Sequence, residues 1–199
     1  VRFARHYSQA SPCAPGRASL YTGMYQMNHR VVANGTPLDT SFDNVALMAR
    51  RAGYSPALFG YTDQSIDPRD AEGPDAPRLS SYEGVLPGFE CVLDLTQDFE
   101  PWRMWLRDQG FDVDMSIVKL LGTEHERPVE ASVSTFLTNE LLSWISEQEQ
   151  GWFAHASYIR PHPPYSAAGE FGAMYDPAST GEPIAVAEKV HPFHEVMLA

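Results

Sequence analysis

Apolar residues recur along this chain with two different periods, and the two periods alternate. Residues 41–53 (SFDNVALMARRAG) and 130–150 place apolar side chains at helical spacing, which predicts two amphipathic helices. Residues 55–62 (SPALFGYT) form a continuous apolar run, and residues 152–159 (WFAHASYI) alternate, so both are predicted as strands. Helices that alternate with strands predict an α/β fold, with a mainly parallel sheet flanked by helices.

Shorter elements are predicted between these four. Residues 1–10 are typical of a strand or its approach. Residues 15–22 favour a short helix, because Pro15 suits a first helical turn and Gly23 a helix end. Residues 64–101 are rich in Pro, Gly and Asp and indicate a long excursion, followed by a short helix within 101–110. Reactive groups in parallel α/β sheets lie on loops beyond the strand ends, so we expect chemistry after residues 62 and 159.

Composition narrows the function classes. The 199 residues carry a formal net charge of −12, which argues against nucleic-acid binding because a polyanion needs clustered Lys and Arg. No apolar run is long enough to span a bilayer, so we expect no membrane partner and a cytoplasmic location. Two cysteines, Cys13 and Cys91, cannot form a disulfide framework, and a single bridge between them is the less favoured alternative. Val1 opens the chain without Met, and we expect a piece of a longer domain.

Cys13 stands directly before a Pro-Gly-Arg turn in the stretch SPCAPGRASLYTGMY. A helix that starts there presents free N–H groups and a partial positive charge, and Arg17 adds a planar cation suited to an oxyanion. Such a position favours an ionised thiol or binds an anionic substrate beside it. An isolated cysteine at a helix start is more often structural, so this local argument leaves both interpretations open.

The spacing of the motif changes that balance. CAPGRASLYTG has the pattern C-x-P-x-R followed by a Thr-Gly helix end, and it resembles the signature of the sulfatases. The flank ASLYTGMYQMNHRVVANGTPLD resembles one branch, the phosphonate monoester hydrolases and their relatives. Gly16 stands where the family usually has Ser or Ala. The resemblance implies an alkaline-phosphatase-like fold, with residues 1–199 as part of the catalytic domain and 63–125 as an insertion within it.

Family chemistry then implies roles for individual residues. Sulfatases convert the motif cysteine to formylglycine, and the hydrated aldehyde, ionised by a divalent metal (Ca, Mn or Mg), attacks sulfur or phosphorus. Cys13 would therefore be nucleophile and metal ligand, and Arg17 would offset negative charge. The implied function is hydrolysis of sulfate or of phosphate and phosphonate esters. The partners of the protein would be a small anionic ester and a formylglycine-generating enzyme. Assembly as a homo-oligomer is compatible with this expectation.

Two loops are predicted to complete the site. In GYTDQSIDPR, Tyr61 matches a family tyrosine that contacts the substrate anion, although a packed aromatic is an equal alternative. Asp63 stands where the branch has a hydroxyl, and an acid there repels an anion unless it is paired or protonated. In SYIRPHPPY, His162 matches the histidine that touches the ester oxygen, which makes it a candidate acid. Arg160 is interpreted as structural.

The resemblance places the remaining metal ligands outside this sequence, so we expect the chain alone to be inactive. Alternatives to the sulfatase hypothesis are a phosphonate monoester hydrolase or phosphodiesterase with little sulfatase activity, and a non-catalytic remnant in which Cys13 stays a thiol. A cysteine hydrolase with a Cys13–His162 pair is least favoured, because no third group is indicated. His191, His194 and Glu195 have metal-like spacing but are interpreted as a surface segment, and His155 as a core residue.

Overall fold

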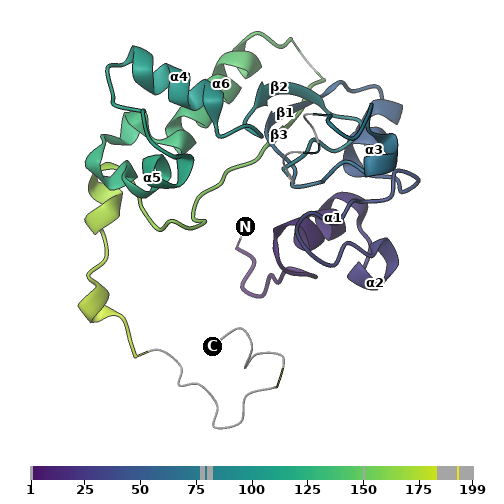
Figure 1. Cartoon of the computed structure of the whole chain (residues 1–199), viewed down its shortest axis with the longest axis horizontal. Helices are drawn as coiled ribbons and strands as arrows, with labels where there is room; N and C mark the ends of the chain where they lie inside the picture. The colour runs from purple at the N-terminus through teal and green to yellow at the C-terminus, as the bar shows by residue number, and fades with distance from the viewer. Residues whose placement is uncertain (1, 77–78, 80–82, 150, 183–191, 193–199) are drawn as a thin grey trace.

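A three-stranded parallel sheet forms the centre of the molecule in the computed structural model, which describes residues 2–76, 79, 83–149, 151–182 and 192 (Figure 1). Strand β1 (Pro56–Gly60) lies in the middle, between β2 (Glu90–Asp94) and β3 (Phe153–Ala156). Both strand pairs are parallel, and the β1–β2 register shifts between Leu58 and Phe59. The predicted fold class, an α/β fold with a parallel sheet, is confirmed.

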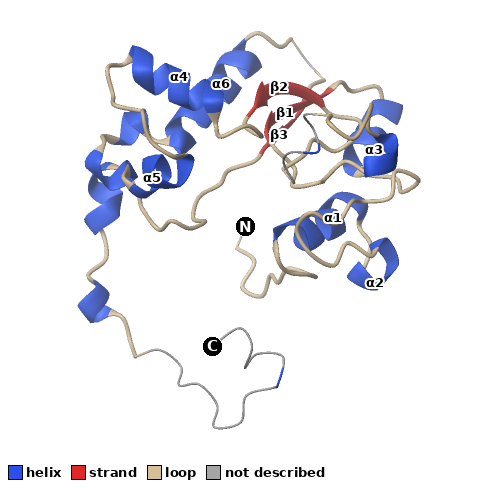
Figure 2. Cartoon of the chain, viewed as in Figure 1, coloured by secondary structure: helices blue, strands red, loops and turns tan. Residues whose placement is uncertain are grey.

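Helices pack on both faces of this sheet (Figure 2). The helices are α1 (Cys13–Thr22), α2 (Gln26–His29), α3 (Val45–Arg51), α4 (Glu100–Asp108), α5 (Ile117–Gly122) and α6 (Val133–Ser146). Short 3-10 turns lie between or after these helices, at Pro68–Asp70, Glu124–Glu126, Val129–Ala131, Gly169–Ala173 and Pro177–Ser179. No helix among the described residues is long and apolar enough to cross a membrane.

Alternating residues of β1 divide the core into two layers. Ala57 and Phe59 pack against α4, α5 and α6, and Leu58 packs against α1 and α3 on the opposite face. Trp102 of α4 is fully buried in the first layer, where its indole N–H donates to the carbonyl of Ala131 at 3.1 Å. Because β1 is covered on both sides, its loop is held rigidly at the carboxyl end of the sheet.

Several boundaries differ from the sequence prediction. Residues 2–10 form no strand, so the prediction of a strand at 1–10 is wrong for the part of that range that the structure describes. Strand β2 lies inside the stretch interpreted as an excursion, and α5 was also missed. Only Leu93 of β2 is buried, because β2 is an edge strand, so the segment carries little apolar signal. The predicted helices at 15–22, 41–53, 101–110 and 130–150 are confirmed, with shifted ends.

Candidate active site

Cys13 is the first residue of α1, two positions earlier than predicted. It is partly buried and lines a cleft of about 620 Å³ together with Arg17. The backbone of the next residue, Ala14, is held by two side chains. Its N–H donates to Asn34 Oδ1 at 2.9 Å, and its carbonyl accepts from Gln64 Nε2 at 3.2 Å. The backbone that carries the thiol is therefore held by two side chains from other loops.

The departure from the family motif at Gly16 also has a local explanation. A Cβ at Gly16 would lie 3.0 Å from the carbonyl oxygen of Ala10 and 3.1 Å from Ser8 Oγ. Contacts this short require the neighbouring backbone to shift. In this chain, residues 8–10 approach the first turn of α1 closely because position 16 has no side chain.

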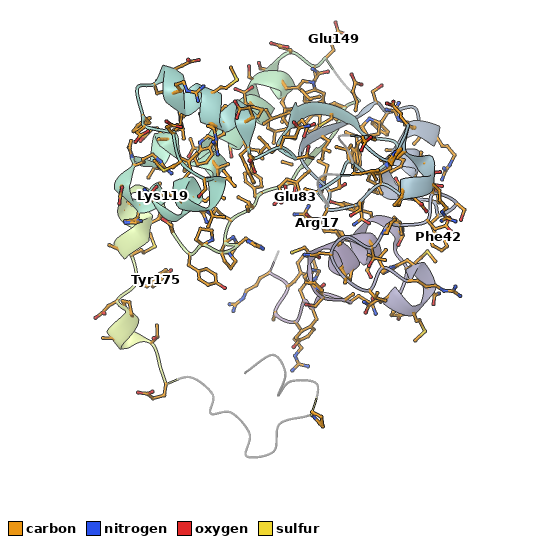
Figure 3. The ribbon with its side chains drawn as sticks, viewed as in Figure 1. Arg17, Phe42, Glu83, Lys119, Glu149 and Tyr175 are labelled. Atoms are coloured by element: carbon orange, nitrogen blue, oxygen red, sulfur yellow. The ribbon has the colours of Figure 1, made fainter. Side chains whose placement is uncertain are left out.

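Arg17 lies one helical turn after Cys13 and joins α1 to the loops that follow β1 and β3. Its Nε pairs with Asp63 Oδ2 at 2.8 Å. Its Nη1 donates to Ser157 Oγ at 2.7 Å and to the carbonyl of Tyr61 at 3.1 Å. The guanidinium also lies over the Tyr61 ring, 5.1 Å from its centroid. In Figure 3, Arg17 lies in the middle of the molecule beside Glu83, at the carboxyl edge of the sheet.

The surroundings of Asp63 explain how an acid can lie next to a site for anions. Its side chain is only 6% exposed, and burial raises the pKa of this carboxyl while Arg17 and His162 lower it. The acid is therefore paired rather than free to repel an anion. Asp63 adopts a left-handed backbone conformation with φ of 54°, which short polar residues tolerate better than most. The same conformation turns the chain at the end of β1 so that the carboxyl meets Arg17.

Tyr61 is packed as the alternative interpretation expects, and its contact with a substrate anion stays a prediction. The side chain is 5% exposed and packs edge-on against Phe99, with ring centroids 6.0 Å apart. The Tyr61 ring also makes a cation–π contact with the Arg17 guanidinium, which lies over its face. Burial, then the neighbouring Asp63 carboxylate, raise the pKa of the Tyr61 hydroxyl, so the group stays protonated and remains a hydrogen-bond donor.

His162 is exposed on the loop that follows β3. Its Nδ1 lies 2.8 Å from the carbonyl of Pro163, which can only accept, so Nδ1 carries the proton and Nε2 is the unprotonated nitrogen of the neutral ring. His162 is one of two groups that lower the pKa of the Asp63 carboxyl, so the ring lies within electrostatic range of the Arg17–Asp63 pair. No hydrogen bond joins Cys13 to His162 in the described part of the chain, so the structure offers no support for a cysteine–histidine dyad.

Two features of the site were missed at the sequence level. Glu83 lies near Asp63, and burial together with the charges of Asp63 and Asp98 raises the pKa of the Glu83 carboxyl to about 7. Tyr21 connects the site to β3, because its hydroxyl lies 3.1 Å from His155 Nε2 and 3.4 Å from Arg17 Nη1. Glu83 carries no sequence signal, whereas Tyr21 stands four residues after Arg17 and so on the same helix face.

Other sequence predictions are resolved more simply. Cys13 and Cys91 are both free, so the disfavoured bridge is absent. His155 is only partly buried within β3, although it was interpreted as a core residue. The prediction at His191, His194 and Glu195 falls outside the described residues. The described residues contain no group of three His, Cys, Asp or Glu side chains able to hold a metal, and Asp63 is already paired with Arg17, so these residues do not by themselves fit a divalent cation.

The fold and the placement of these residues define an alkaline-phosphatase-like α/β domain. The phosphonate monoester hydrolase of Agrobacterium radiobacter has a TM-score of 0.80 and 42% identity to this chain, and the phosphonate monoester hydrolase SpPMH of Silicibacter pomeroyi has a TM-score of 0.81 and 40% identity. Each match covers 92% of this chain and 38% of the solved one.

Residues 1–182 match the Sulfatase family, and the chain belongs to that family. It is 35% identical over 197 residues to the multifunctional alkaline phosphatase superfamily protein PehA of Trinickia caryophylli, which covers 92% of this chain. It is 28% identical over 183 residues to the choline-sulfatase of Rhizobium meliloti (strain 1021), which covers 88% of this chain. The chain spans 38% and 34% of these two relatives, so it corresponds to little more than a third of their length.

Proposed function

We propose that the complete gene product hydrolyses small anionic sulfate or phosphate and phosphonate esters, with Cys13 converted to formylglycine by a formylglycine-generating enzyme. The observation that carries the proposal is the position of Arg17, one turn from Cys13 and held by Asp63, Ser157 and the Tyr61 carbonyl. Family membership supports it independently. A cytoplasmic location stays a prediction.

The chain's own residues supply binding and proton transfer. Formylglycine at position 13 would provide a nucleophilic hydroxyl for attack on sulfur or phosphorus. Arg17 lines the cleft, and its Nε and Nη1 are held by Asp63, Ser157 and the Tyr61 carbonyl, so little reorganisation is needed when negative charge develops. The protonated Tyr61 hydroxyl is available as a donor to the ester. His162 presents Nε2, which in the imidazolium form gives a proton to the departing alcohol oxygen.

A divalent metal (Ca, Mn or Mg) is also part of the proposal, with position 13 as one ligand. The described residues do not form a cation site by themselves.

A second candidate within the same chemistry is a phosphonate monoester hydrolase or phosphodiesterase with little sulfatase activity. Both solved neighbours carry the name phosphonate monoester hydrolase and are 40% and 42% identical to this chain, more than the 28% of the choline-sulfatase. The two candidates differ only in the ester that reacts faster, so one substrate panel separates them.

The test is a comparison of 4-nitrophenyl sulfate, phenylphosphonate monoester and phosphodiester substrates, using the complete gene product co-produced with a formylglycine-generating enzyme. We expect Cys13→Ala to abolish turnover of every substrate and Arg17→Lys to lower kcat/KM by about 10²-fold, because Lys cannot reproduce the planar fork. Turnover that survives Cys13→Ala would refute the proposed nucleophile. A wild-type protein that keeps Cys13 as a thiol and turns over none of the three esters would support the non-catalytic alternative.

A further inference from the structure

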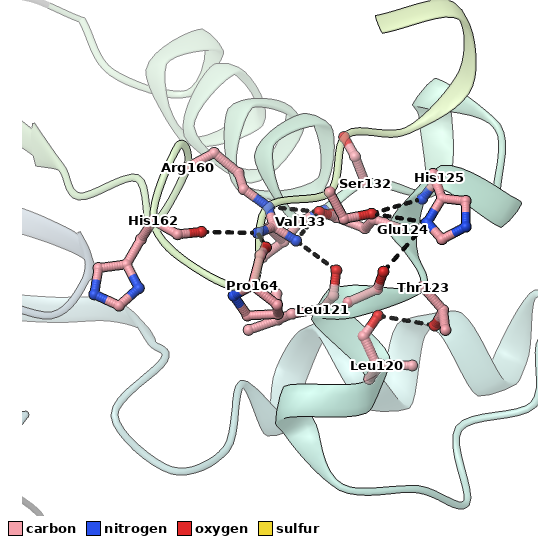
Figure 4. A network of polar contacts seen from close by, with 12 residues as sticks. Leu120, Leu121, Thr123, Glu124, His125, Ser132, Val133, Arg160, His162 and Pro164 are labelled. Carbon is pink, nitrogen blue, oxygen red and sulfur yellow. Dashed lines mark hydrogen bonds and ion pairs between the residues drawn. The ribbon is translucent and has the colours of Figure 1, made fainter. Parts of the chain in front are cut away.

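A largely buried ion pair between Arg160 and Glu124 lies beside the loop that carries His162 (Figure 4). Arg160 Nε lies 2.6 Å from Glu124 Oε2, and its Nη2 contacts the same oxygen. The second Nη2 hydrogen bond goes to the carbonyl of Leu121 at 2.7 Å. Nη1 donates to two carbonyls of the loop itself, those of Pro164 at 2.7 Å and His162 at 3.1 Å.

Glu124 is anchored to the core on its other side. The residue is 1% exposed, and its Oε1 accepts from the backbone N–H of Val133 at 2.8 Å, at the first turn of α6. A buried ion pair stabilises a fold little compared with apolar packing, because both charges lose their hydration. Its contribution to stability therefore does not explain the Arg160–Glu124 pair, and the groups that its remaining hydrogen bonds hold in place offer a better explanation.

The loop sequence supplies that explanation. Residues 161–164 read PHPP, and three of these four residues have no backbone N–H. The loop cannot fix its path through a ladder of its own amides, and its carbonyls must find donors elsewhere. Arg160 supplies two of them from a single rigid guanidinium that Glu124 orients. The acceptor that fixes the imidazole, the carbonyl of Pro163, lies between the two carbonyls that Arg160 holds.

We propose that Arg160, oriented by Glu124, is a positioning residue that fixes the ring and tautomer of His162 for proton transfer to the leaving group. The proposal rests on the proposed function, because it assigns Arg160 a role through His162. The side-chain hydrogen bonds of Arg160 go to Glu124 and to backbone carbonyls. Arg160 was interpreted as structural from the sequence, and the distinction is testable because a merely structural residue affects catalysis independently of His162.

The chain offers a matched control in Arg127. Arg127 is also buried, donates to the carbonyl of Leu120 next to Leu121, and stacks over Trp102 at 5.6 Å. Among the described contacts, none of its side-chain hydrogen bonds goes to residues 161–164. Arg127→Lys therefore perturbs the same helix end as Arg160→Lys without loosening the His162 loop.

The experiment is a double-mutant cycle on the complete, formylglycine-containing gene product. We expect Arg160→Lys to lower kcat/KM by about tenfold or more for an alkyl ester, and by less for a 4-nitrophenyl ester that needs no proton. In a His162→Ala background the same substitution should change kcat/KM by less than about twofold. Glu124→Gln should behave like Arg160→Lys, and Arg127→Lys should leave kcat/KM within about twofold. Fully multiplicative losses in the double variant would overturn the proposal.

A second readout does not depend on activity. Histidine ¹⁵N NMR at a pH where the ring is neutral reports directly whether Nδ1 carries the proton. We expect one Nδ1–H tautomer for His162 in the wild type and in Arg127→Lys, and a mixture of tautomers in Arg160→Lys. An unchanged single tautomer in Arg160→Lys would overturn the positioning role. If His162→Ala leaves catalysis intact, the assignment of His162 in the proposed function fails and the catalytic purpose of the positioning fails with it, whereas a tautomer that still depends on Arg160 shows that Arg160 orients the ring.

Discussion

Replacing Asp63 by Asn removes one negative charge from the centre of the site, and it also lowers the pKa of the Glu83 carboxyl, which that charge helps to raise. Arg17 keeps its hydrogen bonds to Ser157 Oγ and the Tyr61 carbonyl, and its position over the Tyr61 ring. The new amide oxygen can still accept from Arg17 Nε. The orientation of the guanidinium is therefore retained, and the dominant effect is electrostatic: an anionic ester no longer shares its cation with a carboxylate.

The size of this effect follows from the geometry. Asp63 Oδ2 lies 2.8 Å from Arg17 Nε. An oxyanion on the cleft side of the same guanidinium would lie roughly 6 Å from that carboxylate, given ordinary hydrogen-bond lengths. Two unit charges at about 6 Å repel by about 0.7–3 kcal/mol for effective dielectric constants of about 80 to 20. Asp63→Asn should therefore tighten binding of the anion by about 3- to 100-fold.

The assay measures KM for the best ester and the inhibition constant of the anionic product, inorganic sulfate or phosphate, at two ionic strengths. Asp43→Asn is the matched control, because Asp43 pairs with Arg51 on the exposed surface and the net charge changes equally. We expect both constants to fall in Asp63→Asn and to stay unchanged in Asp43→Asn. Weaker product binding in Asp63→Asn would refute the reasoning and show that Asp63 is needed to orient Arg17.

Two further predictions concern stability. Glu83 binds protons more tightly in the folded state, where its pKa is about 7, than at its ordinary value of 4.5, so ionisation costs stability as the pH rises through this range. Glu83→Gln should raise the Tm more at pH 8 than at pH 5, and an equal rise at both pH values would contradict this. Trp102→Phe deprives the buried carbonyl of Ala131 of its donor and should lower the free energy of unfolding by about 1–3 kcal/mol in a urea titration. Trp152→Phe, at an exposed position, should change it by less than about 0.5 kcal/mol, and equal losses would disprove the role of the buried hydrogen bond.

The sequence carries strong signals for the parts of the fold that are buried on a regular period. β1 is buried along its whole length and α6 has a wide apolar face, so both could be predicted. β2 could not be, because a single residue of its five, Leu93, is buried. The N-terminal helix was predicted from its proline and glycine boundaries, although it begins at Cys13 rather than at residue 15.

The candidate site likewise contains residues that the sequence could predict and contacts that it could not. The motif around Cys13 and Arg17 is local, so its resemblance to the sulfatase signature could be seen in the sequence. The pairing of Arg17 with Asp63 joins residues 46 positions apart, and the contact of Arg160 with Glu124 joins residues 36 positions apart. Periodicity along one chain reports which residues share a face of an element, not which loops meet in space. These two ion pairs could therefore be identified only from the structure, in which the sheet brings their loops together.

The most direct test of the central claim is the mass of the peptide that carries Cys13, taken from complete gene product made together with a formylglycine-generating enzyme. The proposed function predicts loss of one sulfur and two hydrogens and gain of one oxygen at this residue. The Cys13→Ala protein, treated identically, calibrates the measurement. An intact thiol in the wild-type peptide would contradict the claim that this chain carries a sulfatase-type nucleophile.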